Sequence, residues 1–137
     1  MKKGKIVHAK DLKRIPSIEP PLMNLRGINS KTVESPMVTV NRTFIPPGAG
    51  NQRHYHIKND AAGYILKGRL KMIFGPEHEK EEDVGEAGDF FYYPRGVIHG
   101  LINLSDTETA EIITCHGGMS SIEEVGDATV FVDPLKK

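Results

Sequence analysis

The sequence predicts an all-β protein with a single domain, and three observations support this prediction. Short runs of β-branched and aromatic residues recur about every ten residues, separated by Gly, Pro and Asn, as is typical of a β-sandwich or β-barrel. Signals for long helices are nearly absent. The length of 137 residues is usual for one domain and suffices for one sizeable core.

The predicted strands follow one another closely from residue 37 onward. In order they are Lys5–His8, Met37–Ile45, Gln52–His56, Ala62–Leu66, Arg69–Phe74, Asp89–Tyr93, Gly100–Leu104, Glu111–Cys115 and Thr129–Val132. Two turns are better defined than the strand ends. Pro46–Gly50 contains two prolines, which cannot sit in a central strand, and Pro94–Gly96 is a second turn. Both turns precede histidines.

The remaining segments are predicted to lie outside the barrel strands. Residues 1–35 contain three prolines and little periodicity, so we expect an N-terminal arm that packs on the barrel or on a partner subunit. Residues 36–137 then form the barrel domain. Residues 75–82 are rich in charge and favour a solvated hairpin loop, with an acidic ligand-binding patch as the alternative.

The composition argues against several classes of protein. Lys and Arg (18) balance Asp and Glu (18), so no net positive field favours nucleic acid or an anionic membrane surface. No apolar stretch approaches the roughly 20 residues needed to span a bilayer, and the N-terminus is charged rather than signal-like. The single cysteine, Cys115, cannot form an internal disulfide. We therefore expect a cytoplasmic protein with no nucleic-acid or membrane partner.

A pair of histidines provides the first indication of chemistry. In His54-Tyr55-His56 the two imidazoles leave the same face if the segment is a strand, with α-carbons about 6.5 to 7 Å apart. That spacing lets two rings close on one metal ion, with metal–nitrogen bonds of about 2.0 to 2.1 Å. The pair by itself fits two surface side chains better than it fits a metal site.

A longer pattern strengthens the metal interpretation. Residues 88–103 resemble the second cupin motif, in which a glycine, a Pro-x-Gly turn, a histidine and an asparagine have fixed spacing, here filled by Gly88, Pro94, Gly96, His99 and Asn103. Gly48, His54, His56 and Gly68 resemble the first cupin motif. The glycines suit sharp turns, and Asn103 suits a structural role in holding a loop.

The resemblance, which covers residues 36–115, is to the small RmlC-like cupins. It implies a double-stranded β-helix or jelly-roll barrel, often dimeric, with a metal ion near one end. It also implies a small-molecule ligand and a homodimer. The ion is a divalent transition metal, and imidazole ligands suit Zn, Fe, Ni, Cu and, with a carboxylate, Mn.

One position departs from the family pattern, in which a glutamate is the fourth ligand. Counting back from Gly68 gives Ala61, whereas counting on from His56 gives Asp60. We therefore predict the ligands His54, His56, His99 and Asp60, although aspartate is shorter and reaches the ion only if its loop bends inward. Without Asp60, a three-histidine site with open positions for water or substrate remains.

Other residues are weaker candidates. Gln52 shares the parity of the histidine pair, and Tyr64 is a possible pocket phenol. His8, His78 and His116 lie outside the motifs and favour surface or strand-end positions, with His116 the strongest of the three. Cys115 favours a buried apolar role. Residues 90–93 are all aromatic, so one face is expected to line the barrel and the other to meet a second sheet or subunit.

Two functions follow from this pattern. The first is a metal-dependent enzyme acting on a small oxygen-rich metabolite, of the dioxygenase, isomerase, lyase or cyclase type known among cupins. The second is a binding module that holds a metabolite or a metal without turnover. A metal-free epimerase-like cupin is disfavoured because all three motif histidines are present.

Overall fold

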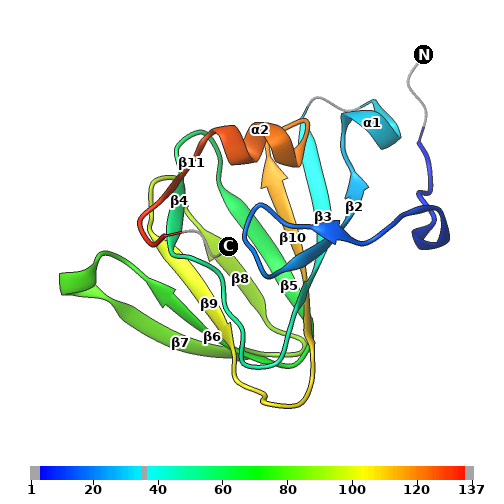
Figure 1. The fold of residues 1–137 in the computed structure, drawn as a ribbon. Helices are drawn as coiled ribbons and strands as arrows, with labels where there is room; N and C mark the ends of the chain where they lie inside the picture. Colours follow the sequence, from blue (N-terminus) through cyan, green and yellow to red (C-terminus); the bar gives the residue numbers. More distant parts are fainter. Residues whose placement is uncertain (1–3, 35–36, 135–137) are drawn as a thin grey trace.

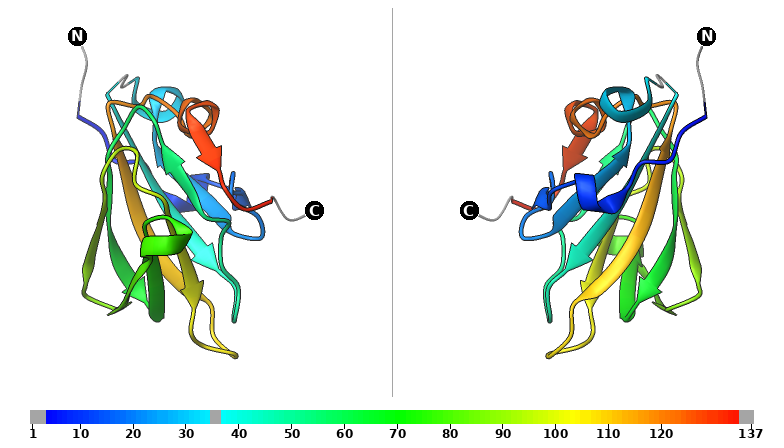
Figure 2. Two further views of the ribbon diagram at one scale, coloured as in Figure 1. Left: turned by 90° about the vertical axis from the view of Figure 1, so that its left-hand side faces the viewer. Right: turned by 90° about the vertical axis from the view of Figure 1, so that its right-hand side faces the viewer.

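The computed structural model describes residues 4–34 and 37–134, which fold into two antiparallel sheets (Figures 1 and 2). The six-stranded sheet has the order β1-β2-β3-β10-β5-β8, and the five-stranded sheet has the order β11-β4-β9-β6-β7. The helices are short, and α1 (Ser30–Val33) and α2 (Ile122–Asp127) lie together at one end of the sheets (Figures 1 and 2). The predicted all-β jelly-roll class is confirmed.

The elements have the following bounds. The strands are β1 Ile15–Pro16, β2 Met23–Ile28, β3 Val38–Ile45, β4 His54–His56, β5 Ala61–Lys67, β6 Arg69–Phe74, β7 Glu81–Glu86, β8 Phe90–Tyr93, β9 His99–Asn103, β10 Ala110–Gly117 and β11 Thr129–Phe131. The helices are η1 Ala9–Asp11, α1 Ser30–Val33, η2 Glu77–Glu79 and α2 Ile122–Asp127.

Two strands at the centre of the larger sheet divide the interior into a polar end and an apolar end. On β10, Ala110 and Ile112 are buried toward one end, whereas His116 is buried toward the other. On β3, the buried Thr39 and Asn41 lie on the same face as His116, because Thr39 pairs directly with it. The polar end of the barrel is therefore built into the strand sequences.

The apolar end holds the main core. Its buried members are Leu22, Ile45, Ala61, Ile65, Leu70, Met72, Phe91, Tyr93, Leu101, Ala110 and Ile112. Gly68 turns the chain from β5 into β6 with a positive φ of 97°, and a Cβ there would lie 2.8 Å from the Cβ of Ala110. The predicted turn role of this motif glycine is confirmed, because only glycine fits both constraints.

The strand predictions are confirmed except at the N-terminus and at one edge. Arg69–Phe74 has the predicted bounds, and other motif strands differ only at their ends. The predicted strand Lys5–His8 is wrong, since this segment is irregular and Ile6 is 77% exposed. The charged strand β7 was not predicted because Glu81–Glu86 lies on an exposed sheet edge without apolar alternation.

Part of the predicted N-terminal arm extends the larger sheet. β1 pairs with β2, and β2 pairs with β3. These two strands, within residues 15–28, are therefore the outer strands at one edge of the larger sheet. Residues 1–3 and the predicted domain boundary at 35–36 lie outside the described residues, and the division of the chain there stays a prediction.

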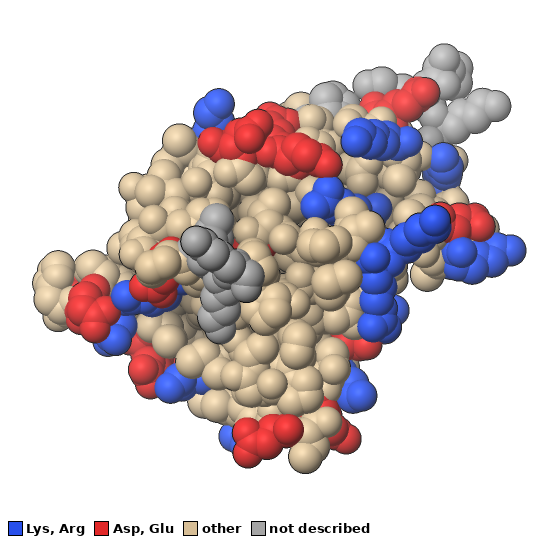
Figure 3. Space-filling model, viewed as in Figure 1, with Lys and Arg blue, Asp and Glu red and all other residues tan. Residues whose placement is uncertain are grey.

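The surface carries both signs of charge. Figure 3 shows acidic side chains gathered over α2, whose first turn contains Glu123 and Glu124, and basic side chains elsewhere on the same face. Within the described ranges, no helix combines the length and the apolar character needed to cross a membrane.

Candidate metal centre

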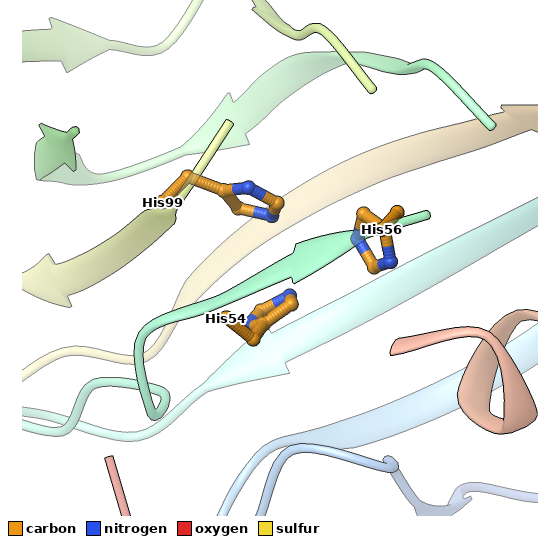
Figure 4. A group of neighbouring side chains, drawn as sticks. All are labelled: His54, His56 and His99. Atoms are coloured by element: carbon orange, nitrogen blue, oxygen red, sulfur yellow. The ribbon is translucent and has the colours of Figure 1, made fainter. Parts of the chain in front are cut away.

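Three histidines from two neighbouring strands converge in the interior (Figure 4). His54 and His56 lie on β4, and His99 lies on β9 directly opposite His54 in the strand register. One ring nitrogen from each lies within 4.8 Å of the others, and the three side chains are buried. The strand periodicity predicted for the first pair therefore holds, and cross-strand pairing adds the third ring.

The rings are held by packing and by the loop before β9. The ring of Tyr93 stacks on that of His99 with centroids 3.8 Å apart, and Phe131 packs against His54 at 5.3 Å. The backbone N–H of Gly96 donates to the carbonyl of His56 at 2.8 Å, which ties the loop before His99 to β4. Gly96 has a positive φ of 80°, as expected for a turn glycine. The sequence thus places the imidazoles on a rigid support.

Backbone carbonyls fix the tautomers of two of the rings. The Nδ1 of His54 lies 2.7 Å from the carbonyl oxygen of Gln52, and the Nδ1 of His99 lies 3.0 Å from that of Val97. A carbonyl oxygen can only accept, so each Nδ1 must carry the proton and donate. In the neutral ring, Nε2 is then left with a free lone pair.

A hydroxyl fixes the third ring in the same way. The Nδ1 of His56 lies 2.9 Å from the Oγ1 of Thr129. That hydroxyl donates its own proton to the carbonyl of Val125 at 2.7 Å, so it must accept from His56. All three rings consequently present Nε2 lone pairs, as expected of imidazoles oriented by outer-shell partners to bind a metal.

Burial keeps two of these rings in the neutral form that binds metal. Burial, with a smaller contribution from the neighbouring His54, lowers the pKa of His56 to about 2 and that of His99 to about 4. The Nε2 of His54 is buried and has no hydrogen-bond partner in the described part of the chain. An orphaned lone pair between two other imidazoles fits a divalent ion, which would be held by His54, His56 and His99.

A fourth histidine has the opposite tautomer. His116, on β10, is 6% exposed, and its ring centroid lies 5.2 Å from that of His56. The side-chain amide of Asn59 lies 3.0 Å from the Nδ1 of His116 and also donates to the carbonyl of Asp60 at 3.0 Å, which fixes the amide orientation. His116 therefore accepts at Nδ1 and carries its proton on Nε2. In this tautomer it is a hydrogen-bond donor.

A small cavity lined by both polar and apolar side chains adjoins the histidines. Its volume is about 40 Å³, enough for a few water molecules. The wall opposite β4 includes Asn24, Asn41 and Thr43. Both amide atoms of Asn41 and the Oδ1 of Asn24 are buried without partners among the described residues. Because unpaired buried polar atoms cost about 1 to 3 kcal/mol each, this wall is suited to a polar ligand.

The structure brings together three of the four predicted ligands. Asp60 is exposed, and its Oδ1 accepts a hydrogen bond from the backbone N–H of Arg95 at 2.8 Å, so it lies outside the histidine group. The loop before β5 does not bend inward. Ala61, at the alternative motif position, is buried but has no ligand atom.

The weaker candidates have structural positions. Gln52 is buried and its amide donates to the carbonyl of Pro20 at 2.8 Å. The prediction that Tyr64 is a pocket phenol is wrong, because its ring packs edge-on against Phe90 on the outer face of the sheet. Asn103 is confirmed as structural, since its amide donates to three backbone carbonyls of the adjoining loops.

The other predicted positions are mostly confirmed. His8 and His78 are exposed. Phe91 is buried whereas Phe90 is 81% exposed, so the aromatic strand has one inner and one outer face. Cys115 is half-buried on the outer face rather than fully buried, and burial raises the pKa of its thiol.

Sequence reasoning missed one site residue and underweighted another. Glu19 lies beside the cluster, with its Oε1 3.4 Å from the Nε2 of His54. It is an isolated glutamate in a proline-containing segment, so no spacing pattern pointed to it. The sequence does contain one pattern that could have identified His116. Side chains alternate between faces along β10, so His116 shares the inner face with the buried Ile112.

The chain belongs to the cupin family, because the model described as "Cupin domain" matches residues 41–116, more than half of the sequence. Germin-like protein subfamily 3 member 2 of Arabidopsis thaliana is 33% identical over 81 residues, which cover 58% of this chain and 34% of that protein. Oxalate oxidase GF-2.8 of Triticum aestivum is 31% identical over 81 residues, covering 56% and 36%. The chain thus spans about a third of the length of these relatives.

Solved structures share the fold. The polyketide cyclase RemF of Streptomyces resistomycificus superposes with a TM-score of 0.74 at 16% identity, covering 98% of this chain and 89% of that one. Oxalate decarboxylase of Bacillus subtilis, studied for its Mn(II) centres, gives a TM-score of 0.72 at 20% identity, covering 96% and 34%. At these identities the similarity establishes the fold.

Proposed function

We propose that this protein is a metal-dependent enzyme that acts on a small oxygen-rich molecule. The proposal rests on the convergence of three Nε2 lone pairs beside a small cavity that His56 and His99 line. The metal ligands are His54, His56 and His99. Three protein ligands leave coordination positions open, as a catalytic ion requires.

The surrounding residues define what the chain itself contributes. A bound divalent ion would act as a Lewis acid toward a carbonyl or carboxylate oxygen, or activate water or dioxygen. His116 presents an Nε2–H at the same cavity and can donate a hydrogen bond to an oxygen of the ligand. The amide of Asn41, which pairs with no described residue, offers both a donor and an acceptor on the opposite wall. These groups orient a ligand that carries several oxygen atoms.

The lining also limits the charge of the substrate. Among the described residues that line the cavity there is no Lys or Arg, and Glu19 contributes a carboxylate. Negative charge on a ligand would therefore be met mainly by the metal ion. We expect a monoanion such as glycolate to bind more tightly than the dianion oxalate, the compound named in several relatives.

The first test is metal content. The untagged protein should contain close to one transition-metal ion per chain by elemental analysis. His99→Ala should lose the ion, whereas His78→Ala, a matched control at an exposed histidine outside the cluster, should keep it. A folded wild type without metal, or undiminished binding in His99→Ala, would contradict the proposal.

The second test is metal-dependent ligand binding and turnover. Glycolate should raise the melting temperature of the metal-loaded protein and not that of the metal-free protein, and Asn41→Leu should reduce this shift. Proton NMR of the mixture then follows conversion of glycolate and related hydroxy and keto acids. Binding without conversion across such a panel would favour the alternative, a non-catalytic binding module.

A homodimer remains part of the proposal, and the outer face of the larger sheet supports it. Phe90 is 81% and Tyr92 is 55% exposed, next to Tyr64 and Ile113 in a mainly apolar surface. Light scattering should give twice the chain mass for the wild type and the single mass for a Phe90→Ser, Tyr92→Ser variant.

A cytoplasmic location also stays a prediction, which cell fractionation tests.

A further inference from the structure

A carboxylate from the N-terminal segment faces the histidine cluster. Glu19 lies between β1 and β2, far from both motifs in sequence and outside the region matched by the family model. Its Oε1 is 3.4 Å from the Nε2 of His54. Two ligand atoms that each lie about 2.1 Å from one ion, at an angle near 109°, are separated by about 3.4 Å.

The two facing atoms are both hydrogen-bond acceptors. His54 uses its Nδ1 proton for the carbonyl of Gln52, so the neutral ring presents a lone pair at Nε2. That Nε2 is buried and makes no hydrogen bond to any described residue, Glu19 included. A lone pair and a carboxylate oxygen facing each other in a buried site repel each other unless a proton or a metal ion lies between them. The nitrogen of His54 and the oxygen of Glu19 therefore form a pair of electron donors that suits a bound cation.

Neighbouring residues hold Glu19 in place and leave one oxygen free. The amide of Asn51 donates to its Oε2 at 2.6 Å, and the Oδ1 of Asn51 accepts from the backbone N–H of Leu101 on β9 at 2.8 Å. The amide of Gln52 donates to the carbonyl of Pro20, the residue that follows Glu19. Contacts from Asn51 and Gln52, shortly before β4, thus orient the carboxylate, and Oε1 has no hydrogen bond to a described residue.

The residues at the family's carboxylate position do not take this role. Asp60 is exposed and bonded to the backbone of Arg95, and Ala61 has only a methyl group. We propose that Glu19 is the fourth protein ligand of the ion, supplied by the N-terminal segment instead of the first cupin motif. The proposal rests on the metal site proposed above and specifies its fourth ligand.

Ion binding then requires a small closing movement of one side chain. The ligand atoms that lie within 4.8 Å of one another come from His54, His56 and His99, so Glu19 adjoins this group at His54. A glutamate has the reach to close on the ion by side-chain rotation, whereas an aspartate at the same position is shorter by one methylene. An anionic oxygen ligand beside three imidazoles also suits Mn(II) better than imidazoles alone.

The test compares Mn(II) binding by the full chain and four variants, using electron paramagnetic resonance to count free and bound ion. Loss of outer-shell partners costs about 10- to 100-fold in metal affinity, so losing a direct ligand in Glu19→Gln should cost roughly 100-fold or more. Glu19→Asp should also bind weakly. Asp60→Asn, which keeps the Oδ1 acceptor for Arg95, is the matched control and should bind like the wild type. His54→Ala should abolish binding.

A second readout separates a ligand from a nearby carboxylate. The spectrum of bound Mn(II) and the visible absorption of bound Co(II) report the ligand set, and both should change in Glu19→Gln at saturating metal. Wild-type affinity and an unchanged spectrum in folded Glu19→Gln would overturn the assignment while leaving the histidine site intact. Failure of the wild type to bind metal would instead refute the metal site itself, and Glu19 with it.

Discussion

Four buried histidines lie in or directly beside one cavity, which His56, His99 and His116 line, but three of the rings present hydrogen-bonding groups opposite to those of the fourth. His54, His56 and His99 donate from Nδ1 to oxygen acceptors and present Nε2 lone pairs. His116 accepts at Nδ1 from an amide and presents an Nε2 proton. The difference shows that hydrogen-bond partners one layer from the cavity, rather than residue type, decide which imidazole can bind an ion.

The same comparison contrasts the two sheets. The ligand histidines all lie on the five-stranded sheet, whereas His116 and the polar wall of Asn41 and Thr43 lie on the six-stranded sheet. One sheet therefore supplies lone pairs for a cation, and the other supplies hydrogen bonds for a ligand. Glu19 joins the cation side from the segment before β2.

The largest expected effect is on metal affinity when each histidine is replaced by glutamine. His54→Gln, His56→Gln and His99→Gln should each weaken Zn(II) binding by roughly 100-fold or more, because each removes a direct ligand. His116→Gln should bind Zn(II) with an affinity close to that of the wild type. Competition with a chromophoric chelator measures all four. If His116→Gln lost as much Zn(II) affinity as the other three variants, His116 would be a metal ligand, and the distinction between it and the other three histidines would be wrong.

A smaller effect is expected from the outer-shell hydroxyl of Thr129. Thr129→Val keeps the shape but removes the acceptor for His56 Nδ1, so Zn(II) affinity should fall by about 10- to 100-fold. Thr39→Val is the matched control, because the buried hydroxyl of Thr39 has no hydrogen-bond partner among the residues that the structure describes. Equal affinities in the two variants would show that Thr129 does not orient the ring.

The smallest effect concerns the stability of the metal-free protein in acid. Burial lowers the pKa of His99 and of His116 from 6.5 to about 4. At a pH between about 4 and 6.5, both rings are neutral in the folded protein and protonated in the unfolded protein. The unfolded state then binds more protons, so the free energy of unfolding falls as the pH falls, by about 1.4 kcal/mol per pH unit for each ring.

Urea unfolding at several pH values between 4.5 and 7 measures this slope. The His116→Asn variant should show a slope smaller by about one proton, because one depressed imidazole is missing. Carboxylates with lowered pKa values, such as that of Asp133, contribute equally in both proteins and cancel in the difference. Identical slopes would mean that His116 is not held neutral in the folded state.

The motif strands and the histidine group could be predicted from sequence because short-range patterns encode them. Alternation puts His54 and His56 on one face, and the glycines of the turns have the positive φ angles that their spacing implies. Asp60 and Tyr64 could not be placed, because one residue of register decides which face a strand residue occupies. The structure puts both outside the cavity.

Long-range contributions were beyond the sequence patterns. Glu19 reaches His54 through tertiary packing of the N-terminal segment against Asn51 and Gln52, more than 30 residues away. The tautomers depend on partners such as Thr129, which is 73 residues from His56. Edge strand β7 has no apolar alternation because it buries little surface.

The most direct test of the central claim is long-range ¹H–¹⁵N NMR of the histidine side chains at neutral pH, before and after addition of Zn(II). Without metal, His54, His56 and His99 should carry the proton on Nδ1 and His116 on Nε2. On adding one equivalent of Zn(II), the Nε2 signals of the first three should shift together while His116 keeps its Nε2 proton. A proton on Nε2 in any of the three, or Nε2 signals that do not respond to Zn(II), would contradict the account.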